Sequence, residues 1–166
     1  MEKRGIDSII ATMLLVLLTV VLAGVIWVSI NGVVNKNISQ SVCYKSYNEV
    51  TFNNQYTCYN SSSNQVQFSV NAGNINISGF TVAMTTSNGN ESESVTVKNT
   101  SQSVQSLEMY NGSTSIAVPG ANSGLTYLFS WNSTDEPSTI QIAPILGSQQ
   151  CPASDSIAQI SNCALI

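Results

Sequence analysis

The sequence contains no histidine and few charged residues. Its 166 residues include five Lys and Arg and nine Asp and Glu, so charged residues make up 8% of the chain and the formal net charge is −4. The absence of histidine removes the commonest general base and the commonest metal ligand of proteins. Five basic residues cannot form the positive surface on which nucleic-acid binding depends. The composition therefore indicates no nucleic-acid partner, and we expect no cofactor and no metal site.

Motifs of catalytic centres are also missing. No serine lies in a nucleophile-elbow setting with a partner base, and no glycine-rich phosphate loop occurs. The carboxylate pairs Glu91 with Glu93 and Asp135 with Glu136 could hold a divalent cation, but each pair stands in a polar turn, where solvated loop charges are the simpler interpretation. We therefore predict that the protein is not an enzyme and has no catalytic residues.

The N-terminal part of the chain is a long apolar segment. Residues 9–30 contain no charge, and apolar residues fall on every face of a helix built from them. At about 1.5 Å per residue this helix spans roughly 33 Å, close to the thickness of a bilayer's hydrocarbon core. A helix with no polar face must lie in lipid or be surrounded by protein. Lys3 and Arg4 precede the segment and favour a cytoplasmic N-terminus.

Three interpretations of this segment compete. A conventional secretory signal has an apolar core of about 7 to 15 residues, and this one is longer. A plain membrane anchor fits the length. The third rests on Lys3, Arg4 and Gly5, which stand immediately before the uncharged segment and resemble the prepilin signal of archaeal type IV pilins and archaellins. Residues 9–15, IIATMLL, also resemble the start of many archaeal pilins.

The resemblance implies a processing site and three segments. A membrane prepilin peptidase would cut between Gly5 and Ile6, so that residues 1–5 are a signal peptide. Residues 6–36 would form a hydrophobic helix that spans the membrane in the precursor and lies in the core of the assembled filament. Residues 37–166 would form an extracellular domain.

The helix carries small and hydroxylated residues that suit close packing. The hydroxyls of Thr12, Thr19 and Ser29 can bond to carbonyls of the same helix. Small residues could permit close approach of neighbouring helices; they are Ala11, Ala23, Gly24 and Gly32. Ordinary membrane-helix composition accounts for the same residues.

The composition changes after the helix. From residue 37 onward the chain has 24 Ser, 11 Thr and 16 Asn. Residues 35–41 are interpreted as a linker, and short alternating runs follow, separated by Gly, Asn and Ser. The expected strands are residues 66–70, 75–77, 80–84, 95–97, 116–118, 125–131 and 140–142. Short strands at this spacing predict an antiparallel, immunoglobulin-like β-sandwich, and hence an α+β fold. Residues 68–82 loosely resemble a strand-turn-strand unit of archaeal pilins and archaellins, with a turn at Gly73 and a bulge near Gly79.

Four cysteines occur, all after the apolar segment. Cys43, Cys58, Cys151 and Cys163 are an even number in a domain expected outside the cytosol, which favours two disulfides. A zinc site is the alternative, although the spacing has no close Cys pair. Pairing of Cys43 with Cys58 and of Cys151 with Cys163 is preferred because each closes a local loop. A bridge from the first pair to the second would instead tie the ends of the domain together.

Asn-x-Ser/Thr sequences offer candidate glycosylation sites. In a secreted chain such acceptors carry glycans on surface loops, although a chain so rich in Asn, Ser and Thr matches the pattern several times by chance. Asn76 is the weakest candidate because it lies in an expected strand. The seven candidates are Asn37, Asn60, Asn76, Asn90, Asn99, Asn111 and Asn132.

These patterns together predict a structural protein. The leading hypothesis is a major pilin of an archaeal adhesion pilus, an extracellular filament on the cell surface whose precursor lies in the cytoplasmic membrane. Its partners would be copies of itself, the prepilin peptidase, the membrane assembly machinery and attached glycans. An archaellin subunit serving motility is the first alternative. A single-pass anchored extracellular binding protein or S-layer-associated protein is the second.

Overall fold

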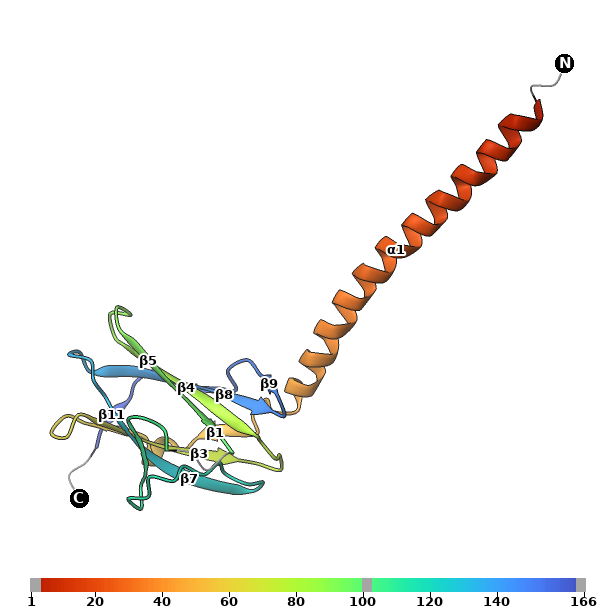
Figure 1. Ribbon diagram of the computed structural model, residues 1–166. Helices are drawn as coiled ribbons and strands as arrows, with labels where there is room; N and C mark the ends of the chain where they lie inside the picture. Colours follow the sequence, from red (N-terminus) through yellow and green to blue (C-terminus); the bar gives the residue numbers. More distant parts are fainter. Residues whose placement is uncertain (1–3, 100–102, 164–166) are drawn as a thin grey trace. The chain divides into compact units, whose positions relative to one another are not determined.

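The computed structural model describes residues 4–99 and 103–163 of the chain, and describes side chains for residues 9–31, 43–99 and 103–163. The chain divides into two compact units, Met1–Gln40 and Ser41–Ile166. The first unit is helical, and the second is built mainly from β-strands (Figure 1). This agrees with the predicted α+β class in its coarse form, an apolar N-terminal helix followed by a sheet-rich unit.

Helix α1 spans Arg4–Tyr44, a length of 41 residues. The linker predicted over residues 35–41 is wrong, because the helix continues through this stretch. Its Asn and Ser residues are weaker helix formers than Ala or Leu, but only by up to about 0.7 kcal/mol each. No Gly or Pro, the residues that interrupt helices most strongly, occurs between Gly32 and the end of the helix.

The helix ends at a turn that Ser46 stabilises. The Ser46 backbone N–H donates to the Cys43 carbonyl at 3.0 Å, and the Ser46 hydroxyl donates to the same oxygen at 2.7 Å. Asn48 then adopts a φ of 63°, a left-handed conformation that asparagine tolerates well. The Glu49 carboxylate accepts a hydrogen bond from the Asn74 backbone N–H at 2.8 Å. The turn after the helix is thereby attached to a loop of the β unit.

The β unit contains two sheets. Its strands are β1 Val50–Phe52, β2 Cys58–Asn60, β3 Gln65–Ala72, β4 Gly79–Thr86, β5 Ser92–Lys98, β6 Leu107–Met109, β7 Ser123–Ser130, β8 Pro137–Leu146, β9 Gln149–Gln150, β10 Asp155–Ile157 and β11 Ser161–Asn162, and the 3-10 turn η1 spans Asn54–Tyr56. The first sheet has the order β11-β2-β3-β7-β6, and β1 also pairs with β3. The second has the order β10-β8-β4-β5, and β9 also pairs with β8. Every pairing is antiparallel except that of β11 with β2.

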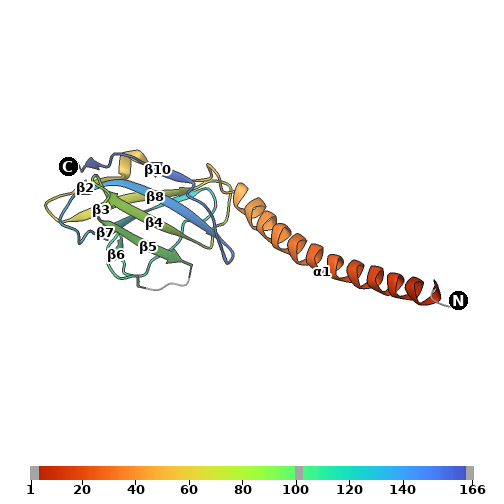
Figure 2. The ribbon, with the colours of Figure 1, turned by 90° about the horizontal axis from the view of Figure 1, so that it is seen from above.

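A single apolar core lies between the two sheets, which form two layers (Figures 1 and 2). Alternate residues of β3 and β4 point inward, as a half-buried strand requires. The Tyr127 ring of the first sheet stacks on Phe68 at a centroid distance of 5.3 Å and meets Phe80 of the second sheet edge-on at 5.4 Å. These three rings therefore connect the two layers at the centre of the core.

The expected strands are only partly confirmed. Residues 66–70, 80–84, 95–97 and 140–142 lie within strands, and residues 125–130 form most of β7. Residues 75–77 and 116–118 are not strands. Ile77 and Ile116 are nevertheless buried in the core. The alternation of apolar and polar residues indicates that every second side chain is buried. An irregular segment can bury its side chains in this way without forming backbone hydrogen bonds to a neighbouring strand.

The two strands and the turn predicted over residues 68–82 are present as β3, a loop and β4, but the strands do not pair with each other and the predicted bulge near Gly79 is wrong. The two strands belong to different sheets, so the segment between them crosses from one layer to the other. The register irregularity lies between Thr85 and Thr86, and not near Gly79. Gly79 has a different role: a Cβ there would overlap the carbonyl oxygen of Val97 on the paired strand β5. Glycine at this position permits the close approach of the two strands.

The preferred disulfide pairing is contradicted. Cys43 is bonded to Cys151 and Cys58 to Cys163, with Cα–Cα distances of 5.3 and 4.9 Å. All four cysteines are used, so the zinc alternative is wrong as well. The topology explains the second bond, because β11 runs beside β2 and the Cys163 backbone N–H donates to the Tyr59 carbonyl at 2.8 Å. The spacing of cysteines along the chain favours pairings that close short loops. It gives no sign that the C-terminal segment folds back beside β2.

We predict that each disulfide contributes several kcal/mol to stability. The bonds link residues 108 and 105 positions apart, and closing loops of about 100 residues removes roughly 4 to 5 kcal/mol of unfolded-state entropy in the chain-entropy model. Replacing Cys58 and Cys163 together by Ser should lower the free energy of unfolding of the detergent-solubilised chain by about 3 to 5 kcal/mol. Peptide mapping of the unreduced wild-type chain should recover Cys43 linked to Cys151. Recovery of Cys43 linked to Cys58 would contradict the structure.

We also predict that the β unit loses stability in alkali. Burial raises the pKa of the Tyr127 phenol far above its ordinary value of 10.0, and its hydroxyl donates to the Ala117 carbonyl at 2.8 Å. Because the unfolded chain deprotonates first, Tyr127 makes the free energy of unfolding fall above about pH 10, by about 1.4 kcal/mol per pH unit. Denaturant titrations from pH 8 to 11 should show a shallower fall for Tyr127→Phe, and no such change for the exposed Tyr47→Phe. Equal slopes for wild type and Tyr127→Phe would refute this role of Tyr127.

Candidate functional site

The most unusual surface of the protein is the apolar part of α1, Ile9–Asn31. It is 23 residues long, contains no charged residue and is 0% buried. Its length as a helix is roughly 34 Å, enough to cross the hydrocarbon core of a bilayer. We call these residues the apolar helix surface.

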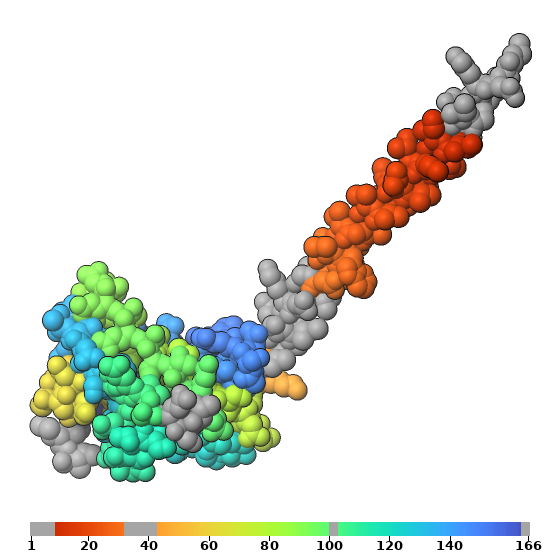
Figure 3. Space-filling view, viewed as in Figure 1, coloured from red at the N-terminus to blue at the C-terminus, as the bar shows by residue number. Residues whose placement is uncertain are grey.

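Large hydrophobic residues fall on every face of the helix over this segment, and Figure 3 draws one face of it in red and orange. Sixteen of them lie between Ile9 and Ile30, with exposed fractions from 51% at Leu22 to 73% at Val28. Burial of one such side chain is worth about 1.5 to 3 kcal/mol, so the sixteen together amount to tens of kcal/mol. The apolar helix surface must therefore be covered by lipid or protein.

The hydroxyl groups of this segment can be surrounded by lipid or apolar protein because each is hydrogen-bonded within the helix. Thr12 donates to the Ile9 carbonyl at 2.9 Å, and Thr19 donates to the Val16 carbonyl at 2.8 Å. Ser29 donates to Val25 at 3.0 Å. These bonds confirm the predicted back-bonding. Each hydroxyl thus has a partner within the helix and loses none when water is removed.

Gly24 is not explained by contacts within the chain. A Cβ at this position would meet no atom within 4 Å. A glycine inside a helix is less favourable than alanine by about 1 kcal/mol. Because no side chain stands at this position, the backbone of α1 is open there to the approach of another molecule.

The two residues of the expected cut lie at the start of α1. The helix begins at Arg4, so Gly5 and Ile6 are helical in their backbone, and their side chains lie outside the described residues. Their role in processing stays a prediction.

Most candidate glycosylation sites lie on exposed loops. Asn76 lies in the β3–β4 loop and is exposed, so the reason for ranking it lowest is removed. Asn60, at the end of β2, is half-buried, and its side-chain oxygen accepts bonds from the Ser62 and Ser63 N–H groups at 3.0 and 3.4 Å. The side chain of Asn37 is outside the described residues. The remaining exposed candidates are Asn90, Asn99, Asn111 and Asn132.

Two of the four carboxylates considered for a cation accept hydrogen bonds from loop residues. Glu93 accepts from the Asn132 backbone N–H at 3.2 Å, and Asp135 accepts from the Asn88 amide at 2.7 Å. Within the described residues, no group of three or more His, Cys, Asp or Glu side chains is placed to hold a metal ion.

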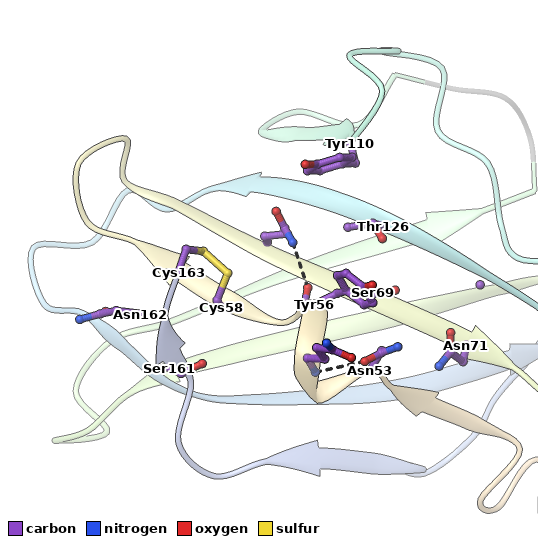
Figure 4. A pocket seen from close by; sticks show the side chains of 13 residues that line it. Asn53, Tyr56, Cys58, Ser69, Asn71, Tyr110, Thr126, Ser161, Asn162 and Cys163 are labelled. Atoms are coloured by element: carbon purple, nitrogen blue, oxygen red, sulfur yellow. Dashed lines mark hydrogen bonds between the residues drawn. A yellow bond between two sulfur atoms is a disulfide. The ribbon is translucent and has the colours of Figure 1, made fainter. Parts of the chain in front are cut away.

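A groove that no sequence pattern indicated lies on the outer face of the first sheet. It has a volume of about 620 Å³ and brings together Tyr56 and Tyr110, which are 54 positions apart in the chain (Figure 4). Neither tyrosine belongs to a motif, and only the folded topology places them at one groove.

Comparison with protein-family models, curated proteins and solved structures finds no match to this chain. The site must therefore be interpreted from its own chemistry. An N-terminal apolar helix of this kind fits a membrane anchor or a signal sequence, and two disulfides indicate an extracellular location for the β unit.

We predict that charge placed on the apolar helix surface prevents membrane integration. Arginine at the centre of a membrane helix costs about 2.5 to 3.5 kcal/mol on insertion scales, so Val20→Arg with Val21→Arg should move much of the newly made chain out of the carbonate-resistant membrane fraction. The control Tyr47→Arg, at a residue equally open to solvent (65% exposed) in the β unit, should stay in that fraction. Extraction of the newly made wild-type chain by carbonate would contradict a membrane-spanning position of the helix.

Proposed function

We propose that the chain is the major structural subunit of an archaeal type IV adhesion pilus. The observation that carries this proposal is the apolar helix surface, which is uncharged, open on all sides and longer than a secretory signal needs. The sequence Lys3, Arg4 and Gly5 before it adds the resemblance to prepilin signals. A structural role needs no catalytic centre.

Processing between Gly5 and Ile6 would prepare the helix for assembly. The precursor would sit in the membrane, with Lys3 and Arg4 on the cytoplasmic side. Removal of residues 1–5 by the prepilin peptidase takes away two positive charges that would otherwise lie among packed apolar helices, where unpaired charge is costly. The mature chain would begin at Ile6.

Assembly would replace lipid around the helix by copies of the same helix. Lipid is about as apolar as a leucine side chain, so the transfer gains little from the hydrophobic effect, and close packing must supply the free energy. Gly24 offers a point where a neighbouring backbone can approach closely. The hydroxyls of Thr12, Thr19 and Ser29 add no desolvation penalty, because their bonds stay within the helix.

The β unit would form the outer surface of the filament. Two layers of mainly antiparallel strands around one core support the immunoglobulin-like sandwich of the proposal. Two disulfides suit an extracellular position. Exposed loop asparagines, among them Asn90 and Asn111, would carry glycans.

Two other functions remain in competition. An archaellin uses the same kind of signal and helix and serves motility. A single-pass anchored extracellular binding protein, or an S-layer-associated protein, is favoured by one specific observation, the groove beside Tyr56 and Tyr110, since an anchored receptor needs a ligand site. The mature N-terminus and the state of assembly separate a filament subunit from an anchor.

We predict that the native chain starts at Ile6 and is found in filaments sheared from cells. Mass spectrometry should give an intact mass that lacks residues 1–5, after allowance for glycans and two disulfides. Gly5→Leu should block the cut and abolish filaments, whereas the neighbouring Ser8→Ala should do neither. A chain that keeps Met1 and stays in the membrane as a monomer would exclude the filament and favour the anchor.

A further inference from the structure

The groove on the outer face of the first sheet has a polar floor. Outward-facing residues of β3 and β7 form it, among them Gln67, Asn71 and Thr126. Gly124 keeps the floor open next to Asn71, since a Cβ at residue 124 would overlap the Asn71 amide oxygen. A volume of about 620 Å³ falls within the roughly 300 to 1,000 Å³ of small-molecule sites.

One wall of the groove is built from η1 and the C-terminal segment. The Asn53 backbone N–H donates to the Ser69 carbonyl at 2.9 Å, and the Asn53 side chain accepts from the Gln55 N–H at 3.1 Å. This holds η1 against β3 and presents Tyr56, which is 52% exposed. The Cys58–Cys163 disulfide fixes β11 beside it, and Figure 4 shows this disulfide at one end of the groove and Asn71 at the other.

Tyr110, just after β6, lines the groove from a separate segment. Its backbone N–H donates to the Thr126 carbonyl at 3.0 Å, so the residue is tied to the floor while its side chain remains 65% exposed. The Gln67 amide donates to the Tyr56 carbonyl at 3.3 Å, which links the floor to η1. The groove is thus formed before any ligand arrives, and little ordering is required on binding.

The chemistry of the lining selects for a neutral ligand rich in hydroxyl groups. Among the described residues that line the groove, none is charged. Amides and hydroxyls both donate and accept hydrogen bonds, as sugar hydroxyls do. Within the described part of the chain, the Asn71 amide and the Thr126 hydroxyl make no hydrogen bond, so both are available to a ligand. Tyrosine rings offer flat apolar faces with a polar tip, which match the C–H faces of a pyranose ring.

We propose that this groove binds a neutral oligosaccharide from outside the chain, with Tyr56 and Tyr110 contacting sugar rings and the floor amides and hydroxyls contacting their hydroxyl groups. A charged ligand would find no counter-charge in the lining. A purely apolar ligand would leave the Asn and Gln amides without partners. The proposal goes beyond a structural role and does not depend on filament assembly, because the site lies wholly within the β unit.

Binding can be measured on the full chain by saturation-transfer difference NMR and calorimetry. The chain is produced in a host that adds no glycans, so that no sugar attached at Asn111, the neighbour of Tyr110, occupies the groove. A zwitterionic detergent replaces glycoside detergents, which would compete. The probes are neutral tetrasaccharides of glucose, mannose, galactose and N-acetylglucosamine, with sialylated and sulfated oligosaccharides as charged comparisons.

We expect at least one neutral probe to bind with a Kd of about 1 mM or tighter, which corresponds to about −4 kcal/mol. Tyr56→Ala and Tyr110→Ala should each weaken this binding about tenfold or more, and Tyr110→Phe should keep most of it because the ring face remains. Tyr47→Ala is the matched control: Tyr47 is also 65% exposed but is not part of the groove, and its loss should change nothing. Circular dichroism checks that each variant is folded.

Three results would overturn the proposal. One is that no neutral probe binds below about 10 mM, and another is that binding survives the combined Tyr56→Ala and Tyr110→Ala variant. The third is that these variants disrupt filaments and leave sugar binding unchanged, which would make the groove a contact between copies of the chain. A chain that never forms filaments but binds sugar through Tyr110 would refute the proposed pilus function and support the proposed sugar site.

Discussion

The structure depends on one constraint, that the apolar helix surface cannot remain in water. Within the described residues nothing covers this surface, because every residue of Ile9–Asn31 is exposed. The features of this segment follow from the same constraint: charges are absent, and the hydroxyls of Thr12, Thr19 and Ser29 bond within the helix. Both disulfides lie beyond it, in the unit that can face an oxidising exterior. Under the proposed function, lipid would cover the helix in the membrane precursor, and copies of the same helix would cover it in the filament.

The β unit has few charged residues, and its apolar core and two disulfides stabilise it. Its core closes around the rings of Phe68, Phe80 and Tyr127, which link two sheets. The two disulfides connect the last turn of α1 and strand β2 to the C-terminal part of the chain. The Cys58–Cys163 bond also fixes β11 against β2, and so builds one wall of the groove. Stability and the candidate binding site therefore share the same covalent link.

The sequence predicted those features that local pattern determines, and it failed where distant segments meet. The helix, its back-bonded hydroxyls and most central strands follow from composition and periodicity. Residues 75–77 and 116–118 alternate like strands, yet only tertiary contacts decide whether a buried alternating segment also joins a ladder. The disulfide pairing and the groove require the return of β11 to β2 and the approach of Tyr110 to β7, and neither is encoded in spacing along the chain. The extension of α1 through residue 44 was missed because weak helix formers were interpreted as helix breakers.

The proposed function requires that copies of the same chain cover the apolar helix surface in the mature protein. Photo-crosslinking tests this requirement most directly. Val21 is replaced by benzoylphenylalanine, and intact cells that carry the variant chain are irradiated. The account predicts adducts between chains, in a ladder of dimers and higher oligomers, because the side chain at position 21 would lie against neighbouring helices. Adducts to lipid alone, with no chain-to-chain product, would contradict it.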